Sequence, residues 1–271
     1  MAEDRITREI DVLRWRDGSV SREPDVIAEE ANVTAHVEPL GILDIVMTPG
    51  SLREFIVGHL YCEGLVQRVE QVMDVTVADR GDDRREVLVE LDPALVEEAS
   101  GDGPFDGVQR RGLIQTECGA PSIWPIRPLS PIGGRFVMTA AAIAGIPRAV
   151  RDRSQLFVET GAFHYAFLLD ADGEPVLEAF DVGRHTAVDK VVGKALFSGT
   201  ALGTTALYTT GRISSDVARK CVRARIPLVI SRGAPLAGAI GMARANDLGM
   251  VGFLRGGRFN VYAGERHIIL D

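Results

Sequence analysis

Cys118 is the residue with the clearest chemical potential in this sequence. It precedes Gly119 within the irregular segment Gly112 to Pro121. A loop of this kind can present a sulfur atom to a partner, and a nearby cation or helix N-terminus would lower the thiol pKa and make it a nucleophile. Cys62 and Cys221 lie in segments expected to be helical, so we expect both to be buried and structural. An incidental loop cysteine is the alternative interpretation of Cys118.

Two glycine–arginine segments follow expected strands. Asp181 to Lys190 (DVGRHTAVDK) and Thr209 to Ser215 (TTGRISS) each connect a strand to a helix. Glycine allows a ligand to approach the backbone, and a helix N-terminus favours anions. Arg184 and Arg212 are therefore candidate phosphate-binding residues, with ordinary strand–helix turns as the alternative.

A third segment places two arginines around a glycine pair. Apolar runs flank Gly256-Gly257, a pattern that predicts a hairpin with a two-residue turn. Two guanidinium groups beside backbone N–H groups suit an anion or a guanine nucleotide. The candidate binding residues are Phe253, Leu254, Arg255, Gly256, Gly257 and Arg258.

Several classes of protein are not supported. The sequence contains no GxxxxGK[ST] motif, no GxGxxG after a strand, no HExxH and no GxSxG. The zinc deaminase signature, HxE with PCxxC, does not occur either, so we predict no zinc and no other metal site. A net charge of −8 argues against nucleic acid as the main partner.

The N-terminus and the hydropathy pattern indicate the cellular location. No apolar run approaches the roughly 18 residues of a membrane span, so no membrane association is expected. Residues 1–16 are charged and lack the apolar core of a signal peptide. We therefore predict a cytoplasmic protein.

The elements that must position these residues alternate in the last 110 residues or so of the chain. Expected strands at 163–169, 176–180, 206–210, 228–231 and 250–254 are interleaved with expected helices at 186–196, 214–224 and 235–245. This alternation predicts βαβ units and a layered α/β fold with a mixed, partly parallel sheet.

Nearer the N-terminus the pattern is less regular. The first thirty residues suggest an edge strand with irregular chain, 42–47 a buried strand, and Ser51 with Glu54 the capping box of a helix. Short strands are expected at 72–77 and 87–91. We predict a smaller mixed α/β region over residues 1–110, a loop with Cys118 over 111–135, and a C-terminal domain over 136–271.

These segments resemble the FdhD family of formate dehydrogenase accessory proteins. The resemblance rests on EAFDVGRHTAVDKVVGKAL, TTGRISSDVARK and VGFLRGGRFNVYAG, and on TPGSLREFIVGHLYCEGLV and ETGAFHYAFLL before them. It extends from about residue 10 to the C-terminus.

The resemblance implies a sulfurtransferase. A cysteine desulfurase would load Cys118 with a persulfide, and the sulfur would pass to a bis-guanine-dinucleotide molybdopterin cofactor destined for a formate dehydrogenase-type molybdoenzyme. It also implies a cytidine-deaminase-like C-terminal domain without zinc, and a homodimer. Arg184, Arg212 and the segment 253–258 would hold the molybdenum cofactor as cargo, with GDP as its mimic.

One position departs from the family pattern. Many members have Cys-Gly-x-Cys-Gly in the loop, whereas this chain has Cys118-Gly-Ala-Pro-Ser122. A one-cysteine relay is compatible with this sequence, but a resolving disulfide within the loop is not. The alternatives are a non-catalytic chaperone for the cofactor and, from a third class, an unrelated enzyme on a deaminase-like fold, against which the missing zinc ligands count.

Overall fold

The C-terminal part of the chain builds a six-stranded mixed sheet. The computed structural model describes residues 5–38, 40–81, 83–95, 110–114 and 128–270. The strand order is β10-β9-β11-β12-β13-β14, and β11, β12 and β13 are parallel to one another. The strands are β9 His164–Leu169, β10 Pro175–Asp181, β11 Ala206–Thr209, β12 Leu228–Ser231, β13 Gly249–Arg255 and β14 Arg258–Ala263.

Helices cover both faces of this sheet. Along β9, Tyr165 and Phe167 pack against α3 (Ala140–Ala149) and α4 (Gln155–Thr160), while Ala166 and Leu168 face the opposite helical layer. That layer consists of α5 Arg184–Ser198, α6 Ser215–Arg223 and α7 Ala237–Ala245. Because both faces of the sheet are covered, the central strands are apolar throughout and do not alternate between apolar and polar residues.

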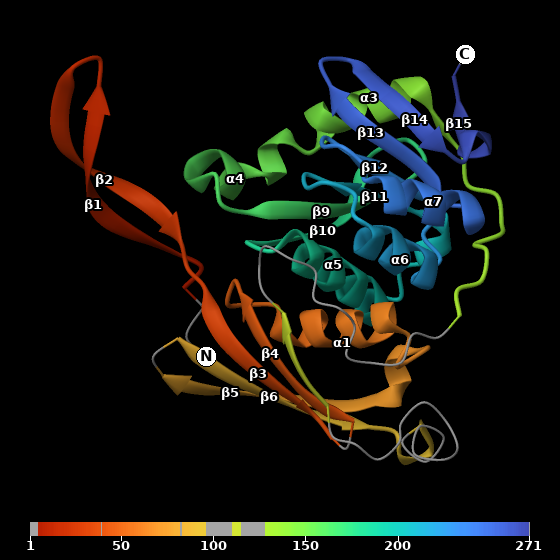
Figure 1. The fold of residues 1–271 in the computed structure, drawn as a ribbon, viewed down its shortest axis with the longest axis horizontal. Coiled ribbons are helices and arrows are strands. Elements are labelled where there is room, and N and C mark those ends of the chain that lie inside the picture. Colours follow the sequence, from red (N-terminus) through yellow and green to blue (C-terminus); the bar gives the residue numbers. More distant parts are fainter. Residues whose placement is uncertain (1–4, 39, 82, 96–109, 115–127, 271) are drawn as a thin grey trace.

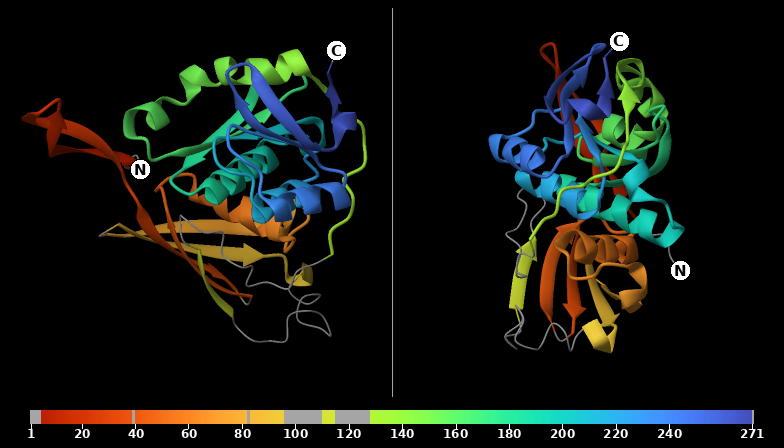
Figure 2. Two further views of the ribbon diagram at one scale, coloured as in Figure 1. Left: turned by 45° about the horizontal axis from the view of Figure 1, so that its top comes forward. Right: turned by 90° about the vertical axis from the view of Figure 1, so that its right-hand side faces the viewer.

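A second, five-stranded sheet lies below these helices. Its order is β5-β6-β3-β4-β7, and helix α1 (Leu52–Glu63) covers its inner face. Figures 1 and 2 show α1 between α5 and this sheet. The strands are β3 Ala31–Val37, β4 Gly41–Met47, β5 Val72–Gly81, β6 Arg84–Leu91 and β7 Arg110–Ile114.

Helices α1 and α5 cross at two glycines. A Cβ atom on Gly58 would lie 1.9 Å from the carbonyl oxygen of Asp189, and one on Gly193 would lie 1.8 Å from the carbonyl oxygen of Glu54. Only glycine permits this backbone approach. The crossing joins the two sheet units into one packed molecule.

The mixed α/β fold, the parallel strands and the hairpin at Gly256-Gly257 confirm the predictions. The capping box at Ser51 was wrong, because Ser51 has φ 53° and ψ 37° and its side chain makes no capping hydrogen bond. Strand β3 was not expected, and β7 begins where a loop was predicted. Short strands β8 (Met138–Thr139) and β15 (Ile268–Ile269) also pair.

Residues 7–28 differ most from the expectation. They form a long hairpin of β1 (Thr7–Arg16) and β2 (Ser19–Ala28), joined at Asp17-Gly18. Both turn residues have positive φ, 49° and 85°, as a type I′ turn requires. Among the described residues, no helix has the length and apolar character needed to span a membrane.

Candidate functional site

The strand order brings four loops to one edge of the six-stranded sheet. Parallel strands β11, β12 and β13 end at the same edge. Strand β9 runs the other way, and its first residue, His164, pairs with Asp181 at the end of β10. The loops after β10, β11, β12 and β13 therefore meet at what we call the carboxyl edge, the usual ligand-binding edge of such sheets.

Each of these loops contributes arginine to the carboxyl edge. Arg184 follows β10 as the first residue of α5, Arg212 follows β11, and Arg232 follows β12. Arg255 and Arg258 flank the turn between β13 and β14. The sequence predicted four of these five residues but missed Arg232, since only the strand order shows that its loop joins the others.

Hydrogen bonds fix the loops against one another. The Ser231 hydroxyl donates to the carbonyl oxygen of Gly211 at 2.5 Å and accepts from the amide of Gly233 at 2.8 Å. The amide of Phe253 donates to the Gly233 carbonyl at 2.9 Å. A Cβ on Gly211 would lie 2.9 Å from the Arg184 Cβ, so the Arg184 side chain packs directly on this glycine. Hydrogen bonds and packing within the protein thus hold the loops of the carboxyl edge in one arrangement.

A pocket of about 320 Å³ opens at the carboxyl edge, between α3–α4 and the strand ends. Its size falls within the range of small-molecule sites. Arginines alternate with aromatic and aliphatic groups around it, a lining suited to a planar anionic ligand. Leu254, Arg255 and Gly256 from the predicted segment line it. The other lining residues are Pro147, Val150, Arg151, Ser154, Phe157, Val158, Tyr208, Thr210 and Arg232.

Strand β13 is irregular where it reaches this pocket. Phe253 has φ 56°, a left-handed conformation that is rare for an aromatic residue, and the register with β14 shifts between Gly252 and Arg255. The Arg255 guanidinium lies 5.4 Å from the centroid of the Phe253 ring, within cation–π range. Such strained backbone is concentrated at functional sites and re-aims side chains.

Two histidines stand beside the arginines. His164 Nδ1 lies 3.3 Å from the Thr210 hydroxyl, and burial, together with the charge of Arg184, lowers the His164 pKa. His185 Nε2 lies 2.8 Å from the Ser214 hydroxyl, and burial lowers the His185 pKa to about 4. His185 is therefore a neutral imidazole at pH 7.

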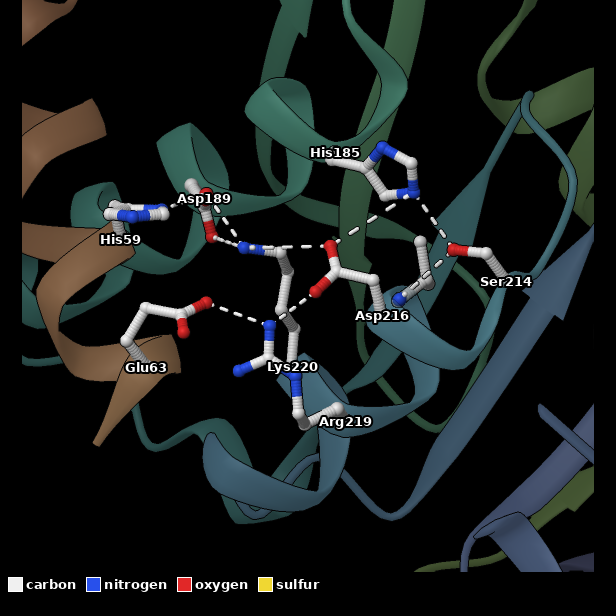
Figure 3. Close-up of polar contacts among 9 residues, drawn as sticks. His59, Glu63, His185, Asp189, Ser214, Asp216, Arg219 and Lys220 are labelled. Atoms are coloured by element: carbon white, nitrogen blue, oxygen red, sulfur yellow. Dashed lines mark hydrogen bonds and ion pairs between the residues drawn. The ribbon is translucent and has the colours of Figure 1, made fainter. Parts of the chain in front are cut away.

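Behind the edge, charged side chains form a buried network between α1, α5 and α6 (Figure 3). Lys220 Nζ lies 2.7 and 2.8 Å from the two carboxylate oxygens of Asp189, which also lies 3.0 Å from His59 Nδ1. Arg219 lies 2.7 Å from Glu63 and also pairs with Asp216. A second buried pair, Lys190 with Asp181, lies 2.7 Å apart.

The pKa values follow from this pairing. Burial alone would raise the pKa of Glu63, but the charges of His59, Lys220 and Arg219 lower it to about 2. Burial opposes ionisation of Asp189 too, yet the Lys220 ammonium and His59 hold its pKa well below the ordinary value. These groups stay charged inside the protein because they are paired. The sequence signal for this network was the presence of charged residues within segments expected to be helical.

Cys118 lies outside the described residues, but the strand that leads towards it is described. Strand β7 ends at Ile114, which pairs with Ile45 of the parallel strand β4. Three residues beyond Ile45, the Thr48 hydroxyl accepts a hydrogen bond from the amide of Val182 at 3.0 Å, just before Arg184. Strand β7 therefore points at the carboxyl edge, and the four residues from Ile114 to Cys118 can span at most ~14 Å.

The other two cysteines are buried, as predicted. Cys62 and Cys221 are fully enclosed, and burial raises the pKa of both thiols. Within the described ranges, no group of three or more His, Cys, Asp or Glu side chains could hold a metal ion. The absence of a zinc site stays a prediction.

Comparisons with known proteins give a consistent result. The model of the FdhD/NarQ family matches residues 28–269. A sulfur carrier protein FdhD from Streptomyces avermitilis is 34% identical, with 98% of this chain and 97% of that protein covered. One from Anaeromyxobacter dehalogenans is 35% identical, with 93% and 91% covered. A crystal structure of a proposed formate dehydrogenase accessory protein from Desulfotalea psychrophila superposes with a TM-score of 0.73 at 24% identity, over 98% of this chain and 100% of that one.

Proposed function

Because the chain belongs to the FdhD/NarQ family, we propose that it is a sulfur carrier that serves the maturation of a formate dehydrogenase-type molybdoenzyme. In this proposal Cys118 receives sulfur from a cysteine desulfurase, and the carboxyl edge holds the acceptor, a molybdopterin guanine dinucleotide. The observation that supports it most directly is that β7, which leads to Cys118, points at the edge where the arginines gather.

The carboxyl edge suits a phosphate-rich cargo. Phosphates need localised positive charge and backbone N–H groups, and a negative protein can supply both in one cluster. Arg232 and Arg255 line the pocket together with Tyr208 and Phe157, so a charged phosphate and a flat guanine can be bound side by side. Arg184 and Arg212 stand on the neighbouring loops and extend the positive surface.

The first sulfur step needs only one cysteine. The Cys118 thiolate attacks the outer sulfur of the desulfurase persulfide, the sulfur–sulfur bond of that persulfide breaks, and the desulfurase cysteine leaves as a thiolate. The persulfide is then on Cys118. Release of its terminal sulfur as sulfide takes two electrons, and with Pro121 in the place of a second cysteine, these come from a donor outside the loop, such as an external thiol.

Mass spectrometry of the intact chain tests the sulfur step. Incubation with a cysteine desulfurase and cysteine should add about 32 Da, the mass of one sulfur. The adduct should disappear in Cys118→Ser and persist in Cys221→Ala, because Cys221 is buried. If no adduct forms while formate dehydrogenase maturation still requires the protein, sulfur transfer is wrong. The cofactor-chaperone alternative, which the Pro121 substitution favours, would then be correct.

Titration calorimetry with GDP tests the cargo site separately. Arg258→Ala should weaken GDP binding, and Arg255→Ala should weaken it more, because Arg255 is among the residues that line the pocket and Arg258 is not. Loss of a charged hydrogen bond is worth about 1.5–3 kcal/mol, or roughly 10- to 150-fold in affinity. Arg244→Ala, on α7, is the control. Equal GDP affinity in all four proteins would place the cargo elsewhere.

A further inference from the structure

A second pocket lies at the edge of the six-stranded sheet opposite to the carboxyl edge. Helix α6 begins after β11, at the carboxyl edge, and ends before β12, which is parallel to β11, so the last turn of α6 lies at the far edge. There the ends of α6 and α1 and the segment 128–130 enclose a pocket of about 240 Å³. The proposed function uses no residue of this pocket.

The polar groups around this pocket, which we call the α6 pocket, are cationic or neutral. Arg223 and Arg225 line it together with Tyr61, Gln67 and Ser130, and none of its described lining residues is acidic. Burial raises the pKa of Tyr61, so its hydroxyl stays protonated and can donate a hydrogen bond. In a chain with a net charge of −8, a pocket wall that carries two guanidinium groups and no carboxylate favours an anion.

The Arg223 guanidinium is held by a glycine and by a backbone carbonyl. Gly64 has φ 79°, and a Cβ atom on it would lie 3.1 Å from Arg223 Cζ and Nε, so the guanidinium packs directly on the Gly64 backbone. Arg223 Nη1 also donates to the Pro128 carbonyl oxygen at 3.2 Å. A side chain that is already ordered loses less conformational entropy when a ligand binds.

Arg225 occupies a position in which glycine is the usual residue. It follows the C-cap of α6 with φ 59°, the left-handed conformation in which many helices end. A residue other than glycine is strained here, and such strain is concentrated at functional sites. Arg225 Nη1 donates to the Pro131 carbonyl oxygen at 2.9 Å, and because a guanidinium has several N–H donors, others remain for a ligand.

The walls and the size of the α6 pocket restrict the anion further. Val66, Leu129 and Val222 supply an apolar part of the wall. The volume lies below the roughly 300–1,000 Å³ of pockets for drug-sized ligands, which favours a ligand smaller than a nucleotide. An ammonium group on the ligand would be repelled by the two guanidinium groups. The pocket therefore disfavours free amino acids, although they carry a carboxylate.

We propose that the α6 pocket binds an organic carboxylate that carries a short apolar group and no ammonium group. Arg223 and Arg225 pair with the carboxylate, whose planar fork matches a guanidinium, while the apolar group lies against the valine and leucine side chains of the wall. Such a carboxylate belongs either to a free organic acid or to the carboxyl terminus of a polypeptide. Because the α6 pocket is separate from the carboxyl edge, this binding does not depend on the proposed function.

Titration calorimetry of the full chain with two acids that share one apolar group tests the proposal. Isocaproate represents a free acid, and N-acetyl-L-leucine represents a chain terminus. At least one of them should bind at a single site, and the tighter of the two identifies the source of the carboxylate. N-acetyl-L-leucinamide lacks the negative charge and leucine carries an ammonium group, so each should bind roughly tenfold more weakly or worse.

Substitutions at the end of α6 test where the acid binds. Arg225→Gln should weaken binding roughly tenfold or more, the effect of losing a hydrogen bond to a charged group. Arg225→Gly should weaken it similarly and should still fold, because glycine suits the backbone conformation at φ 59°. Arg244→Gln is the matched control: Arg244 is also an exposed arginine near a helix end, where it donates to the Tyr262 carbonyl. This variant should bind the acid like the wild type.

Competition with GDP separates the α6 pocket from the carboxyl edge. Saturating GDP should leave the affinity for the acid unchanged, whereas displacement of the acid by GDP would place it at the carboxyl edge and overturn the proposal. The proposal also fails if neither acid binds, if Arg225→Gln binds as tightly as the wild type, or if the amide binds as tightly as the acid. Inorganic phosphate that binds as tightly as the acids would show an unselective anion site and overturn the carboxylate assignment.

Discussion

Replacement of Lys220 by methionine should destabilise the protein strongly, although Lys220 lies outside the carboxyl edge. The Lys220 ammonium lies 2.7 and 2.8 Å from the Asp189 oxygens, and the two side chains are only 2% and 3% exposed. Methionine retains most of the alkyl volume, so little cavity forms. What changes is that Asp189 loses its principal counter-charge in the protein interior.

The size of the effect follows from burial. Breaking a buried ion pair by removing one partner costs about 3–5 kcal/mol, because the other charge stays desolvated. His59 Nδ1 still contacts Asp189 at 3.0 Å, which points to the lower end, about 3 kcal/mol. Since the free energy of unfolding of a single domain is about 5–15 kcal/mol, the loss is a large fraction of the total stability. The double variant Lys220→Met/Asp189→Asn should cost less than the sum of the two single changes.

Urea unfolding followed by circular dichroism measures these differences. Arg80→Met is the control, because Arg80 pairs with Glu86 at 2.6 Å on the surface, with the side chains 56% and 36% exposed. A surface pair is worth about 0–1 kcal/mol. If Lys220→Met costs no more than Arg80→Met, the network in Figure 3 contributes no more than surface charge, and its structural role is refuted.

Two further predictions concern the same region. Gly58→Ala should unfold or severely destabilise the chain, because its Cβ would lie 1.9 Å from the Asp189 carbonyl oxygen. Gly145→Ala in α3 is the control, since its Cβ would meet open space, and it should stabilise the protein by about 0.5–1 kcal/mol. Thermal or urea unfolding measures both changes. The pKa of His185 falls from 6.5 to about 4 on folding, so only the unfolded chain gains a proton between these values. The free energy of unfolding should therefore fall as pH drops from 6.5 towards 4, by up to about 1.4 kcal/mol per unit, and more shallowly in His185→Gln. Glu63, with a pKa lowered from 4.5 to about 2, adds a loss only below pH 4.5. A pH-independent stability between 7 and 5 would contradict the buried neutral imidazole.

Local pattern was sufficient for the C-terminal strands and helices. Apolar runs such as 206–210 and 228–231 are shorter than ordinary helices and are typical of buried strands, and Gly256-Gly257 between two such runs predicts the observed hairpin. Of the β1–β2 hairpin only one edge strand was predicted, because both faces of the hairpin are largely exposed. Without a buried face its strands show no hydrophobic alternation, and only Asp17-Gly18 signalled the turn.

The charged residues of α5 show more clearly what the sequence could not predict. Arg184 and Asp189 lie five residues apart in one helix, yet one reaches the carboxyl edge and the other is buried against Lys220. Their residue types could not distinguish these roles, because both are charged residues near a glycine-containing turn. The role of each residue depends on which helices pack on α5.

The sequence by itself determined the family, the alternation of strands and helices, and Cys118 as the candidate thiol, because these depend on residues close together along the chain. Only the tertiary structure decided that Arg184, Arg212, Arg232 and Arg255 share one edge and that β7 points towards it. The physical reason is that strand order and helix packing are set by contacts between residues more than a hundred positions apart, such as Thr48 with Val182.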